Sequence, residues 1–256
     1  MSSADASIPG WYGKLPTLGD FASRRLGSDF IEPWDVWLGE GLAAQRATLG
    51  DAWLDAYLHS PTWRFVLMPS ALPGLAPQRA LAGVLMPSVD KVGRYFPLTL
   101  VAGLEALPGS AAEIEQLLGW LHRLEDLALD ALQDDWSIEE LDSALADFAP
   151  PAFAAAGVVP AAVAALAELS QALGSEGSFV AIDGIGGRAE LAALVVQALA
   201  AVETGTWQRS VAGKTFWLAD NPSHPQLLVS QGLPGLVDFA QMFGASGREP
   251  GDVTIF

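Results

Sequence analysis

The sequence contains no cysteine. This absence excludes a disulfide, a thiolate metal site and a cysteine nucleophile. It is compatible with the cytoplasm, and it rules out a secreted module that depends on disulfides. The first seven residues also lack the basic start and the apolar core of a signal peptide. We therefore expect a cytoplasmic protein.

Positive charge is scarce. Thirteen lysine and arginine residues face thirty aspartate and glutamate residues, so the net charge is −17. The segment 105–147 is the most acidic, with one basic and twelve acidic side chains. Such a field opposes nucleic acid and anionic lipid, and we expect neither as a partner. A charged partner of the whole chain would be basic, although acidic helix faces that only confer solubility are the simpler explanation.

Long apolar runs are scarce as well. The one uncharged stretch of twenty residues, 148–167, contains three prolines and a glycine and is rich in alanine. It makes a poor membrane span, so we expect no membrane insertion. With 256 residues, 51% of them hydrophobic, the chain can form a folded globular protein that buries roughly three quarters of its unfolded surface.

Strand and helix patterns are both present. Helical spacing covers 29–49, with Asp29 as a candidate N-cap and Gly50 as a stop, and then 53–58. Two amphipathic helices follow in 110–147, with capping boxes at Ser110–Glu113 and Ser137–Glu140. Later helices are expected up to 173, over 188–203 and after 235. The expected strands are 8–12, 63–68, 84–86, 98–101, 179–182, 215–218 and 226–229.

This order predicts an α/β protein with an α+β tendency. Three consecutive strands in the first half suggest an antiparallel meander covered by helices. We divide the chain into an N-terminal α/β portion (1–108), an acidic helical segment packed on it (109–174) and a C-terminal strand–helix portion (175–256). The alanine- and proline-rich stretch 149–162 is a candidate connector between them. We expect the three parts to form one compact unit.

Two turns stand out because they concentrate positive charge. One runs from Gly13 to Arg25, and the other joins the strands on either side of 87–97. Together they hold five of the thirteen lysine and arginine residues. In so acidic a chain this concentration indicates a recognition site rather than a catalytic one.

One enzyme-like motif is present. Residues 183–189 carry glycines in the loose pattern of a dinucleotide-binding loop between a strand and a helix. The acidic partner that should end the next strand is missing, and no P-loop lysine is present. A glycine turn that seats a helix on a strand explains the motif better.

Other catalytic signals are weak. The three histidines (His59, His122 and His224) lack the spacing of a metal-binding helix. No serine-hydrolase motif occurs, and the paired carboxylates lie on solvated helix faces. We expect no catalytic residue, no cofactor and no metal. The nine tryptophans are expected mainly in the core, with interface anchoring as the alternative.

Four blocks of residues resemble the TagF family of type VI secretion accessory proteins. They are 10–21 (GWYGKLPTLGDF), 34–58, 60–65 (SPTWRF) and 83–97. The later segments 216–218 and 232–234 are similar to the family's C-terminal pattern in outline only. The acidic middle helices depart from that pattern.

The resemblance implies a non-catalytic cytoplasmic repressor of type VI secretion. Its implied partner is the forkhead-associated scaffold protein of that system, with a functional link to a threonine kinase and phosphatase. The implied fold is α/β with a longin-like N-terminal portion. Two other classes stay open: a nucleotide-binding or hydrolytic enzyme that uses the turn Gly184–Ala189, and a structural subunit of the secretion machine.

Our site hypothesis is that the two basic turns lie close together and form a partner-binding edge. The alternative is that Gly13, Gly19 and Gly93 are required for backbone geometry, while Asp20 and Arg94 are structural ion-pair partners. The candidate residues are Lys14, Pro16, Gly19, Asp20, Arg24, Arg25, Asp90, Lys91, Arg94 and Tyr95.

Overall fold

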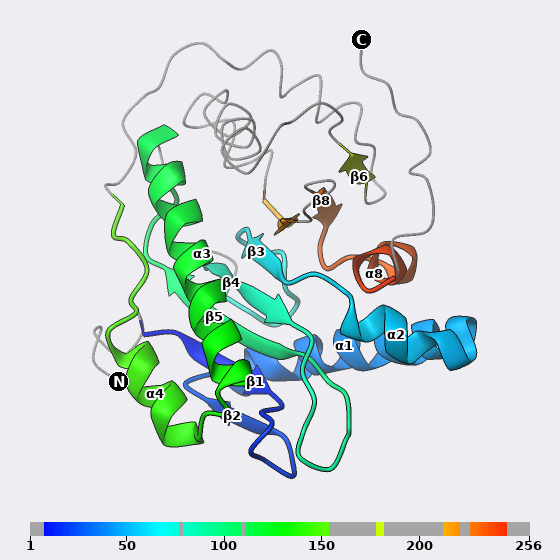
Figure 1. Cartoon of the computed structure of the whole chain (residues 1–256). Helices are drawn as coiled ribbons and strands as arrows, with labels where there is room; N and C mark the ends of the chain where they lie inside the picture. The colour runs from blue at the N-terminus through cyan, green and yellow to red at the C-terminus, as the bar shows by residue number, and fades with distance from the viewer. Residues whose placement is uncertain are drawn as a thin grey trace.

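The computed structural model describes residues 8–76, 79–108, 111–153, 178–181, 212–220 and 226–244. Eight strands from these segments form one sheet in the order β2-β1-β5-β4-β3-β7-β8-β6. Every neighbouring pair is antiparallel. Helix α3 crosses one face of the sheet, and α1 lies behind the other face (Figure 1). The predicted α/β class with an antiparallel meander and covering helices is confirmed.

The strands agree closely with the sequence pattern. The first half supplies β1 (Gly10–Gly13), β2 (Ala22–Arg24), β3 (Trp63–Leu67), β4 (Ala80–Met86) and β5 (Leu98–Leu104). The later segments add β6 (Ser178–Ala181), β7 (Lys214–Ala219) and β8 (Gln226–Gln231). The expected meander is β3–β4–β5. Only β2 was not predicted, because three residues are too few to display a period of two.

The described helices are α1 (Ser28–Leu49), α2 (Trp53–Leu58), α3 (Ala111–Gln133), α4 (Ile138–Ala146) and α8 (Leu236–Met242), with a short 3-10 turn η1 (Gly50–Ala52). The N-cap prediction for α1 is wrong. Gly27 occupies that position without a side-chain cap, and Asp29 lies in the first turn, where its carboxylate complements the helix dipole. Gly50 ends α1 at φ +53°, as expected.

The capping box at the start of α4 is confirmed. The Ser137 hydroxyl accepts from the Glu140 backbone N–H, and the Glu140 carboxylate accepts from the Ser137 backbone N–H. The other predicted box lies partly outside the described residues, because Ser110 is not among them.

Side chains that alternate along the strands pack into two separate cores, one on each face of the sheet. Trp63, Phe65 and Leu67 of β3 all pack in the core on the α1 and α8 side of the sheet. On β4, Leu81 and Leu85 join that same core, while Ala82, Val84 and Met86 pack in the core under α3 and α4. This is the period of two that a sheet covered on both faces requires. The sheet is therefore the middle of three layers.

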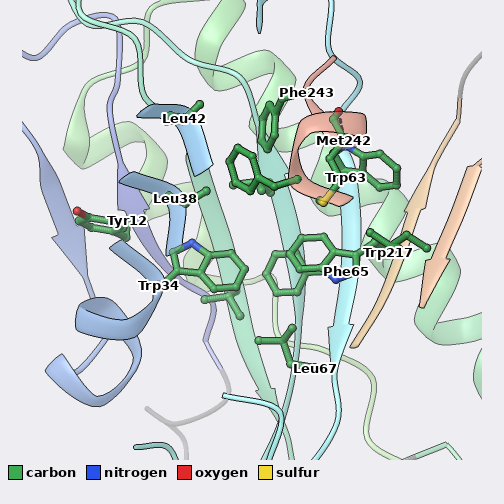
Figure 2. Close-up of a cluster of buried hydrophobic side chains, with 14 of the residues drawn as sticks. Tyr12, Trp34, Leu38, Leu42, Trp63, Phe65, Leu67, Trp217, Met242 and Phe243 are labelled. Atoms are coloured by element: carbon green, nitrogen blue, oxygen red, sulfur yellow. Dashed lines mark hydrogen bonds between the residues drawn. The ribbon is translucent and has the colours of Figure 1, made fainter. Parts of the chain in front are cut away.

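Trp34 of α1 lies at the centre of the first core (Figure 2). Its ring centroid is 5.1 Å from that of Phe65 and 6.0 Å from that of Trp217. Its buried indole N–H donates to the Thr99 hydroxyl of β5 at 2.9 Å. Six tryptophans from the described segments are buried, which favours packing as their main role: Trp11, Trp34, Trp53, Trp63, Trp120 and Trp217.

The late segments complete the sheet beside β3. Strand β7 pairs with β3 from Arg64↔Leu218 to Leu67↔Thr215. The Trp63 indole N–H also donates to the Met242 carbonyl at the end of α8, at 3.0 Å. Residues about 150 positions apart in the chain therefore share one core.

Candidate functional site

The topology brings the two basic turns to one end of the sheet. Strand β1 runs antiparallel to β5, and Tyr12 pairs with Thr99. The chain that leaves β1 at Gly13 and the chain that enters β5 at Leu98 must therefore emerge together. We call residues 14–21 the first loop and residues 87–97 the second loop. Both project from the sheet end below β1 and β5 in Figure 1.

Asp90 joins the two loops. Its Oδ2 atom lies 2.7 Å from the Lys14 Nζ atom of the first loop and 2.8 Å from the Arg94 Nε atom. Its Oδ1 atom accepts from the backbone N–H groups of Val92 and Arg94 at 3.0 and 2.9 Å. Lys14 and Asp90 are both only 3% exposed. One carboxylate thus organises a complete turn and neutralises a buried lysine.

The charge state of Asp90 follows from these contacts. Burial raises the pKa of its carboxyl group, but the hydrogen bonds from Lys14, from the side chain and backbone of Arg94 and from Val92 lower it more. The pKa consequently lies well below its usual range. Asp90 is ionised at neutral pH and stays so in mild acid.

Further hydrogen bonds cross between the loops. The Lys91 backbone N–H donates to the Leu18 carbonyl at 3.1 Å, and the Ser88 hydroxyl donates to the Lys14 carbonyl at 2.8 Å. The Arg94 guanidinium also donates to the Gly19 carbonyl. The two loops are therefore held together at several points and form a single preorganised surface.

Helix α2 contacts the base of the second loop through hydrogen bonds between Tyr57 and Ser88. The buried Tyr57 hydroxyl donates to the Ser88 carbonyl at 2.9 Å and accepts from the Ser88 backbone N–H at 3.0 Å. Burial raises the pKa of the Tyr57 phenol. Tyr95 packs edge-on against the rings of Trp53 and Tyr57. The base of the second loop is thus part of the folded core.

Two of the three loop glycines are required by backbone geometry. Gly13 has φ +135°, and a Cβ atom placed there would lie 2.2 Å from the Pro97 carbonyl oxygen. Gly93 has φ +79°, a region that L side chains rarely adopt. Gly19 has no positive φ, so the geometric explanation holds for Gly13 and Gly93 and not for Gly19.

The structure separates the ten candidate residues into four groups. Lys14 and Asp90 are buried between the loops, whereas Asp20, Lys91 and Arg94 are exposed at their tips, and Pro16, Gly19 and Tyr95 are partly buried. Arg24 and Arg25 instead contact Asp142 of α4, at 3.6 and 3.0 Å. Asp20 accepts from the Phe21 backbone N–H at 2.9 Å. Arg94 pairs with Asp90, so the ion-pair alternative is right for Arg94 but names the wrong second residue.

Two exposed apolar side chains at this end were missed by the sequence reasoning. Phe21 is 44% exposed, although its ring contacts the rings of Tyr12 and Phe96. Val92 is 62% exposed at the tip of the second loop. Each directly follows a charged residue, but both loops hold other apolar residues such as Leu15 and Phe96 that are buried, so no pattern in the sequence distinguished these two.

A second charged cluster joins two strands of the sheet to helix α3. Arg64 of β3 is buried, and its guanidinium lies 2.6 Å from Asp220 at the end of β7 and 3.5 Å from Glu125 of α3. Burial raises the pKa of Glu125, although the charge of Arg64 opposes that shift. His122 lies beside Glu125 at 3.8 Å. The cluster attaches α3 and β7 to β3, so we assign it a structural role.

The remaining chemical candidates receive no structural support here. The glycine turn 183–189 and His224 lie outside the described residues. Within the described segments, no group of three histidine or acidic side chains could hold a metal ion. A search of those same segments finds no helix of the length and hydropathy needed to cross a membrane.

Known proteins are similar to this chain over a region that includes both loops. Residues 10–148 match the model of the TagF N-terminal domain, described as type VI secretion system-associated. The crystal structure of PA0076 from Pseudomonas aeruginosa PAO1 is similar, with 32% sequence identity and a TM-score of 0.65. That alignment covers 97% of this chain and 98% of the other. No curated protein sequence matches significantly.

Proposed function

Because this chain belongs to the TagF family of type VI secretion system-associated proteins, we propose that it represses that secretion system by binding its forkhead-associated scaffold protein. The protein acts in the cytoplasm as a regulator without catalysis. It opposes the threonine phosphorylation switch of the system or acts beside it. The observation that carries this proposal is the family match over residues 10–148, which includes both loops.

The loop end of the sheet is the proposed contact for the scaffold. It is ordered by the Asp90 contacts before any partner arrives, so binding requires little further loss of loop freedom. It also carries exposed apolar and basic side chains together. Such a mixture is more typical of a protein interface than of a solvated turn.

Co-purification with the scaffold is the direct test of this function. We expect the full chain to retain the purified scaffold protein whether or not the threonine kinase is present, and deletion of the chain to raise secretion. Loss of the scaffold in both conditions, with a folded protein, would contradict the proposal. A chain that stays with the assembled machinery, and whose removal abolishes secretion, would be a structural subunit instead.

A further inference from the structure

The tips of the two loops bring exposed apolar and exposed basic side chains together. Phe21 and Val92 are exposed and apolar, while Lys91 and Arg94 are exposed and basic. Loops 14–21 and 87–97 contain three basic and two acidic residues in a chain whose net charge is −17. The two loops therefore carry a small net positive charge, although the chain as a whole is acidic.

The two exposed cations, Arg94 and Lys91, differ in their contacts within the protein. The Arg94 guanidinium is held by Asp90 and by the Gly19 carbonyl, yet its side chain remains 52% exposed. Lys91 is anchored only through its backbone N–H, and among the described residues its ammonium has no carboxylate at ion-pair distance. The Lys91 ammonium is thus available to a carboxylate from another molecule.

The two apolar residues are held in place, Phe21 through its ring and Val92 through its backbone. The Phe21 ring lies 4.8 Å from the Phe96 centroid, and the Lys14 ammonium lies 4.7 Å from the Phe21 centroid. The Val92 backbone is held by the Asp90 carboxylate. An exposed apolar group that is already ordered binds at a lower entropic cost than a mobile one. Both side chains can therefore serve as anchors.

We infer that this surface, defined by Phe21, Lys91, Val92 and Arg94, docks an acidic segment of a protein partner in which carboxylates flank an aliphatic or aromatic side chain. The inference rests on the proposed function, because it specifies the chemistry that the scaffold must present. The acidic chain as a whole suits a basic partner, but at the loop tips the two exposed cations, Lys91 and Arg94, outnumber the one exposed carboxylate, Asp20. Two exposed lysine and arginine side chains are too few to follow a nucleic-acid backbone.

The test uses two binding partners and a matched set of variants. The first partner is a labelled peptide that alternates Glu with Leu and Phe, compared with its Gln-for-Glu analogue. The second is the purified scaffold protein. The variants Lys91→Glu and Val92→Ser change exposed side chains only. The controls are Arg123→Glu and Leu129→Ser, which make the same types of change on the outer part of α3.

We expect the acidic peptide to bind the wild-type chain, and to bind less well at high salt. Lys91→Glu and Val92→Ser should each weaken both the peptide and the scaffold by about tenfold or more, whereas the controls stay within about twofold of the wild type. A scaffold that binds the two loop variants as tightly as the wild type would overturn the inference and leave the repressor function standing.

The other outcomes separate the two proposals further. Failure of the wild-type chain to bind the scaffold, with peptide binding that still depends on Lys91, would reject the function and keep the acidic-segment surface. Equal binding of the Gln analogue would overturn the assignment of an acidic ligand. Binding of a duplex oligonucleotide that is lost in Lys91→Glu would overturn the choice of a protein segment.

Discussion

At the scale of single residues, the arrangement of the first and second loops depends on one carboxylate, that of Asp90. Asp90 is the only acidic residue of the second loop, and it serves Lys14, Arg94 and two backbone N–H groups at once. Removing its charge would leave the Lys14 ammonium buried without a counter-charge. A buried charge without its partner is strongly destabilising.

We therefore predict that Asp90→Asn lowers the midpoint of urea unfolding clearly. Asp20→Asn is the control, because Asp20 is an exposed loop carboxylate whose side chain accepts the Phe21 backbone N–H. The control should unfold close to the wild type. Equal midpoints for Asp90→Asn and the wild type would contradict the organising role of this carboxylate.

The same variant has a distinct pH dependence. The folded-state pKa of Asp90 lies below its ordinary value of 3.8, so its stabilisation is fully present above that value and disappears as the pH falls toward the folded-state pKa. The difference in unfolding free energy between wild type and Asp90→Asn should be constant from pH 7 to about pH 5 and shrink in stronger acid. A difference that grows in acid would contradict the assigned charge state.

What the sequence could predict at this scale was the presence of charges and turn glycines. It could not predict their burial. Lys14 and Lys91 look alike in the sequence, yet Lys14 is 3% exposed and Lys91 is open to solvent. The difference arises from the pairing of β1 with β5, which places Asp90 over Lys14 from 76 positions away.

At the scale of elements, α4 is held to the sheet by its apolar core residues Leu141 and Leu145 and by one polar side chain, Asp142. Asp142 accepts from the buried Trp11 indole N–H of β1 at 3.0 Å and lies 3.0 Å from the Arg25 guanidinium. Arg25 adopts φ +59° and also donates to the Pro9 carbonyl at 2.9 Å. These contacts fix α4 beside the edge hairpin β1–β2.

We predict that Asp142→Ala costs about 1–3 kcal/mol, because it leaves the Trp11 indole N–H buried without an acceptor. The exposed Arg24 contact at 3.6 Å adds little to this loss. Chemical unfolding gives the measurement. Asp130→Ala on α3 is the control, since Asp130 is an exposed acidic side chain, and it should change the free energy much less. A similar loss in both variants would reject the attachment.

Sequence patterns predicted the elements well where their apolar period is long. The stripes of α1 and α3 and the turn chemistry around α4 were sufficient for those helices. Sequence patterns did not predict β2 or the start of α1, where Gly27 rather than Asp29 is the N-cap. Strand β2 is defined by its backbone pairing with β1, and Gly27 caps α1 with its backbone alone, so neither has a side-chain signal in its own segment.

At the scale of the whole molecule, the matched family domain does not contain its own complete core. The family match ends at residue 148, but the core around Trp34 also contains Trp217, Leu228, Phe239 and Phe243. Without these residues β3 becomes an open edge, and its aromatic side chains lose their cover. Open apolar edges promote aggregation.

We predict that a chain ending after residue 153 does not fold as a stable monomer. Gel filtration should find it aggregated, and near-UV circular dichroism should find its aromatic signal lost, whereas the full chain gives a sharp signal because its tryptophans are packed. The full chain is the control under the same conditions. A monomeric fragment with cooperative unfolding would contradict this prediction.

The sequence predicted the class of the fold and the helices on the sheet, but it could not predict the joining of β3 to β7. That pairing spans too many residues for any local pattern to reveal it. The resemblance to the family was similarly strongest in the first half. The contacts of the second half with Trp63 and Trp34 therefore became visible only in the structure.

The pairing of β3 with β7 also has a consequence during protein synthesis. Ribosomes add about 5–20 residues per second, so the roughly 150 residues between these strands take on the order of ten to thirty seconds to make. During that interval Trp63 and Phe65 of β3 lack the cover of β7, because β7 has not yet been synthesised. We therefore expect holding chaperones to bind the nascent chain, and the yield in cells to depend on them more than the stability of the finished protein would suggest.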